Sequence, residues 1–205
     1  MSLVATALPT QIRITGPCAA RAAQMAALVP VLQTPRTRLR APHQSDFAAL
    51  HAIMGSGRAI HAGGPTTPAE TWADFARATA TWLLRGHGMW TVETAGADAS
   101  GEVAGFVLIG TEPGDLEHEL GFLFAADHEG RGLAEEAATA ARYHAWAVLR
   151  LPSLVSYVAT GNDRAERLMH RMGADRDGTL DDGALTVWRH LPPDEHDPDV
   201  ALEAA

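Results

Sequence analysis

A glycine-rich run follows a short apolar segment in the second half of the chain. It reads Glu129-Gly-Arg-Gly-Leu-Ala134 and stands before a stretch of small residues at helical spacing. Backbone N–H groups at the start of a helix lack partners within the helix, and glycines let an anion approach them closely. The run has neither the Gly-Lys-Ser/Thr of a P-loop nor the G-x-G-x-x-G spacing of dinucleotide-binding folds. It therefore predicts an anion cradle of another kind, with a purely structural glycine turn as the alternative.

The predicted strand before this loop, residues 117–124, carries a carboxylate on one face. Because side chains alternate along a strand, its other face is strongly apolar, and that face consists of Leu120, Phe122 and Phe124. A positioned carboxylate can remove the proton that an amine must lose before it attacks a carbonyl carbon. Glu119 is therefore our candidate base, and Glu117 on the same face is the reserve. A solvated surface carboxylate is the alternative for both.

The glycine-rich run resembles the acetyl-CoA signature of the GNAT N-acetyltransferases, Gln/Arg-x-x-Gly-x-Gly/Ala. Gly132 and Ala134 match this signature, whereas Glu129 stands where the family has Gln or Arg. The resemblance extends to the Rim-type branch, the ribosomal-protein N-terminal acetyltransferases. The other segments that carry it are residues 32–40, 61–65, 88–90, 119–122 and 162–173.

The resemblance implies a binding site for acetyl-CoA as co-substrate and no metal. In the family, the CoA pyrophosphate lies on amides of the loop and the first helical turn, and here these are Gly130, Arg131, Gly132, Leu133 and Ala134. The pantetheine arm pairs like an added strand with the end of the preceding strand, here Phe122, Leu123 and Phe124. Asn162 matches the family asparagine that contacts CoA, and a helix cap is a compatible alternative. The family's acceptor loop corresponds to the segment with His61, Gly63 and Gly64, for which simple loop flexibility is the alternative.

The implied reaction is direct attack of a primary amine on the acetyl thioester. The amine belongs to a peptide or protein N-terminus or to a small molecule. The family's general acid is a serine or a tyrosine at fixed distances after the asparagine, and these positions hold Ala165 and Met169. Since neither side chain can donate a proton, a catalytically weak or inactive acyl-CoA sensor or interaction domain is the alternative function.

These residues require a mixed α/β domain to position them. The resemblance implies the acyl-CoA N-acyltransferase fold, in which helices flank a central, mostly antiparallel sheet. Apolar periodicity predicts strands over 36–40, 89–94, 103–109, 117–124, 154–159 and 184–190, and helices over 45–54, 67–85, 130–149 and 164–172. Ser45 is expected to cap the first of these helices, and Thr67 to Glu70 forms a capping box with proline at the first helical position of the second. Apolar periodicity places Trp72 and Leu83 on the buried stripe of that second helix.

Composition limits the classes of protein and the partners. The 205 residues carry a net charge of −9 and no lysine, which argues against nucleic acid, and no apolar run is long enough for a membrane span. The ten histidines are scattered, so no metal site is predicted. Cys18 is the single cysteine, which favours a reducing, cytoplasmic compartment. The family often dimerises, so a homodimer is expected as an option, with Trp188 facing the partner.

The two ends differ from the middle in charge. Residues 1–44 contain five arginines and no acidic residue, which leaves 11 basic against 25 acidic residues for the rest. We expect residues 1–33 to be an N-terminal extension that is partly disordered or holds a short helix over 19–28. Residues 34–191 form the acetyltransferase domain, and 192–205 form an acidic tail.

Overall fold

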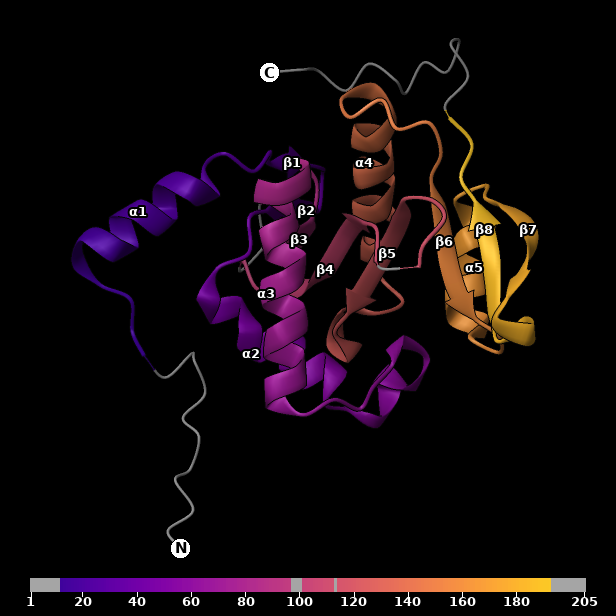
Figure 1. Cartoon of the computed structure of the whole chain (residues 1–205), viewed down its shortest axis with the longest axis horizontal. Helices are drawn as coiled ribbons and strands as arrows, with labels where there is room; N and C mark the ends of the chain where they lie inside the picture. The colour runs from indigo at the N-terminus through magenta and orange to yellow at the C-terminus, as the bar shows by residue number, and fades with distance from the viewer. Residues whose placement is uncertain (1–11, 97–100, 113, 193–205) are drawn as a thin grey trace, which may run out of the picture.

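An eight-stranded sheet forms the centre of the computed structural model, which describes residues 12–96, 101–112 and 114–192 (Figure 1). The strand order is β1-β2-β3-β4-β5-β6-β8-β7, and among the described strands only β5 and β6 pair in parallel. The strands are β1 Leu32–Gln33, β2 Thr37–Arg40, β3 Met89–Thr94, β4 Val103–Gly110, β5 Glu119–Phe124, β6 Val155–Ala159, β7 Asp175–Leu180 and β8 Leu185–Arg189. The predicted meander and the α/β fold are confirmed.

Helices cover both faces of the sheet. The described α-helices are α1 Gly16–Ala26, α2 Phe47–Met54, α3 Pro68–Arg85, α4 Leu133–Ala147 and α5 Asp163–Arg171. Short 3-10 helices are η2 Gln44–Asp46, η3 Gly57–Ala62, η4 Ala126–His128 and η5 Asp181–Gly183. In Figure 1, α3 crosses in front of β3, and α5 lies behind β6 and β8.

Alternation along the strands divides the core into two apolar clusters. On one side of the sheet, Leu120 and its neighbours pack against α4 and α5. On the other side, Phe106 and Leu123 pack against α2 and α3. The face of α4 that meets the sheet consists of fully buried alanines, namely Ala137, Ala138, Ala141 and Ala145. These small side chains let the helix approach β4 and β5 closely, so its N-terminus is held beside the end of β5.

The capping box predicted for α3 is confirmed. The Thr67 hydroxyl accepts a hydrogen bond from the Glu70 N–H at 3.3 Å, and the Thr67 N–H donates to the Glu70 carboxylate at 2.7 Å. Gly86 ends the helix in the left-handed conformation, as expected of a C-terminal glycine. Local sequence signals therefore set both ends of α3.

Three smaller expectations are wrong. Ser45 does not cap α2, because η2 precedes this helix and the Asp46 carboxylate binds the His43 N–H instead. Leu83 is 76% exposed and not on the buried stripe, since the sheet lies against the opposite side of α3. Trp188 is buried in the chain's own core, where it packs edge-to-face on His170, so it cannot face a partner.

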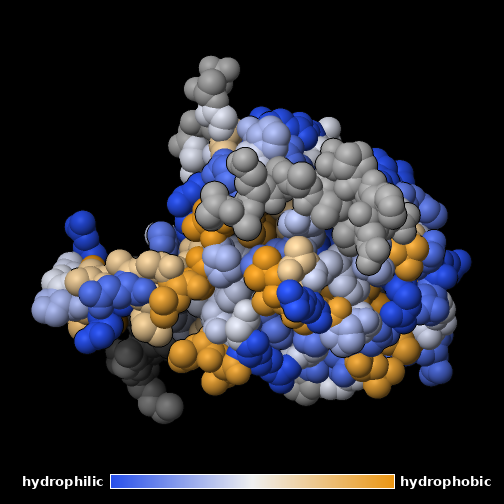
Figure 2. All heavy atoms as spheres, turned by 90° about the horizontal axis from the view of Figure 1, so that it is seen from above, coloured by the Kyte–Doolittle hydropathy of each residue, from blue (hydrophilic) through white to orange (hydrophobic). Residues whose placement is uncertain are grey.

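The N-terminal helix stands away from the sheet. It spans Gly16–Ala26, where a helix over 19–28 was expected, and it has no buried residue. Figure 2 shows it projecting from the body with both apolar and polar groups on its surface. The acidic tail lies outside the described residues from position 193 onward. The domain boundaries, the homodimer and the cytoplasmic location stay predictions. Across the described ranges, no helix has the length and apolar character to cross a membrane.

Candidate active site

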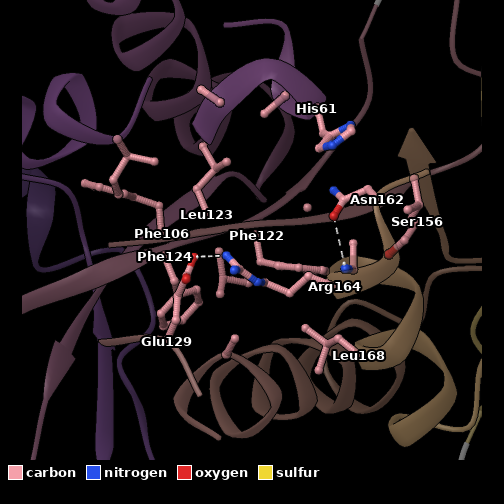
Figure 3. A pocket seen from close by; sticks show the side chains of 18 of the residues that line it. His61, Phe106, Phe122, Leu123, Phe124, Glu129, Ser156, Asn162, Arg164 and Leu168 are labelled. Atoms are coloured by element: carbon pink, nitrogen blue, oxygen red, sulfur yellow. Dashed lines mark hydrogen bonds and ion pairs between the residues drawn. The ribbon is translucent and has the colours of Figure 1, made fainter. Parts of the chain in front are cut away.

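A cleft of about 1180 Å³ opens where β5 and β6 separate (Figure 3). Their parallel pairing is limited to Glu119 opposite Val155, whose N–H donates to the His118 carbonyl at 2.9 Å. Beyond this point β5 stays paired with β4, and β6 stays paired with β8. The two strands therefore diverge toward their carboxyl ends and leave a gap in the middle of the sheet. The cleft is also lined by η3, by the loop before α4 and by the start of α5.

The edge of β5 presents backbone groups to this gap. The Ala125 N–H donates to the Ala104 carbonyl on β4 at 2.9 Å. Because backbone groups of successive strand residues point to opposite sides, those of Phe122 and Phe124 point away from β4 and toward the gap. An extended ligand arm can pair with these groups as an added strand. All three residues of the predicted segment 122–124 thus line the cleft.

The loop before α4 is shaped by two left-handed glycines. Gly130 has φ 70° and Gly132, the residue before α4, has φ 77°. A Cβ atom at Gly132 would lie 3.2 Å from Nη2 of Arg36, whose Nη1 donates to the Arg131 carbonyl at 2.8 Å. The first-turn amides, including that of Ala134, have no partner within the helix, and the helix dipole adds partial positive charge. The predicted cradle residues are together at the cleft, except that the Arg131 side chain does not line it.

Three carboxylates near this cradle are paired with arginines. The ion pairs are Glu129–Arg164 at 2.5 Å, Glu135–Arg171 at 2.6 Å and Glu136–Arg36 at 2.6 Å. Pairing offsets the negative charge that would repel a phosphate group. Glu129, which departs from the family signature, thereby connects the loop to α5, as the dashed line to Arg164 in Figure 3 shows. The cradle therefore fits an anionic ligand such as the CoA pyrophosphate.

Glu119 lies at the point where the strands begin to separate. Burial, together with the negative charges of Asp115 and Glu112, raises the pKa of Glu119 to about 7. A hydrogen bond from the Tyr157 N–H to this carboxylate opposes the shift. A general base works best when its pKa is near the working pH. The structure therefore places a partly buried carboxylate with suitable proton affinity at the closed end of the cleft.

The reserve candidate Glu117 is held in a different arrangement. Both of its carboxylate oxygens accept from the Arg189 guanidinium at 2.8 Å. Hydrogen bonds from Arg189 and Ser153 lower the pKa of Glu117 to about 2. A carboxylate with so low a pKa is a weak proton acceptor near neutral pH. The arrangement favours Glu119 over Glu117 as the base.

Asn162 begins α5 at the cleft. Its side-chain oxygen accepts from the Ala165 N–H at 3.2 Å, so the expected helix cap is present, and the residue also lines the cleft. Ala165 lines the cleft as well, whereas Met169 is fully buried in the core. The structure thus supplies no proton donor at either position where the family has its serine or tyrosine.

Of the three predicted acceptor residues, one borders the cleft. His61 is exposed on η3 and lines the cleft beside Asn162 in Figure 3. Gly63 ends η3 with φ 78°. Gly64 packs so tightly that an added Cβ would lie 2.5 Å from the Cβ of Ala59. Both glycines shape the turn after η3, and their contact with an acceptor stays a prediction.

Sequence reasoning missed a serine that joins β5 and β6. The Ser156 hydroxyl donates to the Leu120 carbonyl at 2.6 Å and contacts His190 Nε2 at 2.9 Å. This side-chain hydrogen bond to Leu120 stands where a further backbone hydrogen bond between β5 and β6 would follow the pair Glu119–Val155. Burial, with a smaller effect of the Arg142 charge, lowers the pKa of His190 to about 4, so the imidazole is neutral. A buried serine in a strand of apolar residues was the available signal.

Metal chemistry has no visible support in the described ranges. Across residues 12–96, 101–112 and 114–192, no group of three or more histidine, cysteine or acidic side chains is arranged to hold a metal ion. The described lining of the cleft includes Asn162, Glu119 and three arginines, together with other ionisable side chains such as Glu129, Glu135 and Asp163. The amides before α4 suit an anionic ligand, and Glu119 suits a proton transfer.

Comparison with known proteins identifies the family. The model of the acetyltransferase (GNAT) domain family matches residues 36–175. A crystal structure of an acetyltransferase from Agrobacterium tumefaciens is 36% identical, with coverage of 80% of this chain and 95% of that chain and a TM-score of 0.75.

Two more distant structures share the fold. RimL, a ribosomal alpha-N-protein acetyltransferase solved with coenzyme A, is 16% identical, covering 79% of this chain and 98% of that chain at a TM-score of 0.63. Spermidine N-acetyltransferase from Vibrio cholerae, solved with CoA and spermine, is 18% identical, covering 76% and 94% at a TM-score of 0.61. The family match over most of the chain and the 36% identical acetyltransferase lead to one conclusion: the chain belongs to the GNAT acetyltransferase family.

Proposed function

We propose that this protein transfers the acetyl group of acetyl-CoA to a primary amine of a peptide or protein N-terminus or of a small molecule. The observation that carries the proposal is the divergence of β5 and β6. It leaves a free strand edge with the anion cradle of α4 at one end and Glu119 at the other. A ligand with a phosphate head and an extended arm ending in a reactive thioester matches this layout.

The chain's backbone supplies binding and orientation. The amides from Gly130 to Ala134 receive the pyrophosphate, and the edge groups of Phe122 and Phe124 pair with the pantetheine arm. One of these edge amides, pointed at the thioester carbonyl, also stabilises the negative charge that develops on its oxygen during attack.

Glu119 performs the proton transfer in this proposal. An alkylammonium has a pKa of about 10, so little free amine exists at neutral pH. The ionised carboxylate takes one proton from the ammonium and so frees the amine. The nitrogen then forms a bond to the acetyl carbon, the carbon–sulfur bond breaks, and the second proton of the nitrogen passes to solvent water. The CoA thiolate, with a pKa of about 8.5, leaves as the anion, because Ala165 and Met169 offer no proton.

A second candidate function follows from Ala165 and Met169, which cannot donate a proton. A protein that binds acetyl-CoA in this cleft but lacks a general acid can act as an acyl-CoA sensor or interaction domain. The absence of a donor at both family positions is the observation that favours it. Turnover separates the two functions, because only the enzyme releases the CoA thiol.

The test combines binding and turnover. Isothermal titration with acetyl-CoA measures affinity, and a thiol reagent follows CoA release with a panel of primary amines. We expect binding together with amine-dependent release. In the Glu119→Gln variant, release should fall while CoA affinity stays the same; Glu102→Gln, an exposed carboxylate before β4, serves as the matched control. Binding without release for every amine would instead support the sensor.

A further inference from the structure

The wall of the cleft next to Glu119 is apolar. β4 and β5 pair so that Gly110 stands opposite Glu119, and Leu108 opposite Gly121. Residues directly opposite each other on paired strands place their side chains on the same face of the sheet. The wall therefore lies on the same face as the Glu119 carboxylate and next to it. Its apolar lining side chains, from α2, η3, β4 and β5, are Ile53, Ile60, Phe106, Leu108 and Leu123.

Two glycines let the Leu108 side chain of this wall lie next to the carboxylate. A Cβ atom at Gly121 would lie 3.6 Å from Glu119 Oε1 and 3.8 Å from the Leu108 Cβ, so the carboxylate lies directly over this glycine. A Cβ atom at Gly110, opposite Glu119, would lie 3.3 Å from the Leu108 Cδ1, so the Leu108 side chain covers this glycine. A substituent next to the reacting nitrogen therefore lies close to the apolar side chain of Leu108.

The wall remains partly accessible. Ile60 on η3 is 68% exposed, although it borders the cleft. Leu108 and Leu123 are only partly buried. Figure 3 shows Leu123 on the side of β5 that faces η3, next to Phe106, whereas Phe122 and Phe124 point to the other side. Covering water-exposed apolar surface with an apolar group of a ligand is favourable, because it removes both apolar surfaces from water.

The lining of this part of the cleft holds one carboxylate. Among the described lining residues on α2, η3, β3, β4 and β5, only His61 and Glu119 are ionisable. Asp115 and Glu112, whose charges act on Glu119, do not line the cleft, and Glu112 pairs with Arg77 at 2.7 Å. A second ammonium group on the acceptor would therefore find no second carboxylate to contact in this lining.

We infer that the acceptor is a monoamine with an apolar substituent. The inference rests on the proposed function, because it concerns the amine that attacks beside Glu119. The amine group approaches the carboxylate, and the substituent covers the accessible parts of Ile60, Leu108 and Leu123. The lining of this cleft thus favours an apolar monoamine over a polycationic acceptor.

The experiment compares kcat/KM for three amines at fixed acetyl-CoA: 2-phenylethylamine, propylamine and spermidine. A single methylene in an apolar pocket changes this ratio by about 10-fold or more. We therefore expect 2-phenylethylamine to exceed both other amines by at least about 10-fold. Equal or higher kcat/KM for spermidine or propylamine would overturn the inference.

A matched pair of surface variants tests the location of the substituent. Ile60→Ser should reduce the ratio of kcat/KM for 2-phenylethylamine to that for propylamine several-fold. Leu83→Ser removes a similarly exposed apolar side chain on α3, away from the cleft, and should leave the ratio unchanged. An unchanged ratio in Ile60→Ser would remove Ile60 from the acceptor site and contradict the assigned wall.

The outcomes separate this inference from the proposed function. Acetylation of polar or polycationic amines without preference for the apolar one would refute the acceptor class and leave the transferase intact. Acetylation of none of the three amines, while another primary amine of the panel is acetylated, would likewise refute the acceptor class and leave the transferase intact. Bound acetyl-CoA without thiol release for every amine of the panel would refute the transferase and the inference with it.

Discussion

Replacing Glu119 with glutamine should change the rate, its pH dependence and the stability of the protein together. Glutamine keeps the shape and can still accept from the Tyr157 N–H, but it cannot take a proton. Loss of a general base reduces turnover by about 100-fold or more. Because glutamine preserves the shape of the site, acetyl-CoA affinity should remain close to that of the original protein.

The pH dependence follows from the pKa of about 7 at Glu119. The reactive form is the carboxylate, so kcat/KM of the original protein should rise with pH up to about 7 and then level off. In Glu119→Gln this limb should vanish, and the residual rate should keep rising toward the pKa of the amine, about 10. If the rise of kcat/KM near pH 7 persists in the variant, a group other than Glu119 causes it.

Stability supplies a readout that does not depend on turnover. The carboxyl pKa is raised from 4.5 to about 7 by folding, so the folded state favours the protonated form. The fold therefore loses stability as pH rises from about 4.5 to about 7, by about 3 kcal/mol at roughly 1.4 kcal/mol for each pH unit.

Glutamine does not titrate, so Glu119→Gln should escape this loss. Urea unfolding at pH 4 and pH 8 measures the difference between variant and original protein at both values. That difference should shift in favour of the variant by up to about 3 kcal/mol at pH 8. An equal difference at both values would refute the burial of a charged carboxylate, whatever the effect on rate.

Three further variants test the cradle, the packing and the cap. Gly132→Ala should weaken CoA binding at least about 10-fold in isothermal titration, because a side chain at this positive φ crowds Arg36; Gly173→Ala, also at positive φ but with open space around it, should not. Ala138→Leu should lower the free energy of urea unfolding by about 1–3 kcal/mol, since α4 lies close to the sheet there. Thr67→Ala should lower it by about 1 kcal/mol through loss of the α3 cap, and an unchanged value would contradict that role.

Signals confined to a few residues in sequence were sufficient for much of the fold. The capping box at Thr67 and the C-terminal glycine of α3 depend on neighbours within one turn, so the sequence alone predicted them. The cap at Ser45 failed because Asp46 has distant partners: Arg40 at 2.6 Å and Thr91 at 2.8 Å. β7 was missed because its residues, Asp175–Leu180, are all exposed and show no apolar alternation.

The candidate site divides in the same way. The glycine-rich run at residues 129–134 predicted the anion cradle from sequence, because positive φ angles and unpaired helix amides are local properties. The proton affinity of Glu119 depends on Asp115 and Glu112, which approach it only in the folded chain. The apolar wall likewise joins η3 to β4 and β5, which are far apart in sequence. Such properties follow from tertiary contacts, and no motif in the sequence carries them.

The most direct test of the proposed transfer is the stoichiometry of one reaction. Acetyl-CoA and each primary amine of the panel, including 2-phenylethylamine, are incubated with the protein, and released thiol and N-acetylated amine are quantified in the same samples. With an accepted amine, we expect both products to appear at equal rates, with 1:1 stoichiometry, and Glu119→Gln to slow both equally. Bound acetyl-CoA without thiol release for every amine, or thiol release without acetylated amine, would contradict the transfer of an acetyl group to an amine in this cleft.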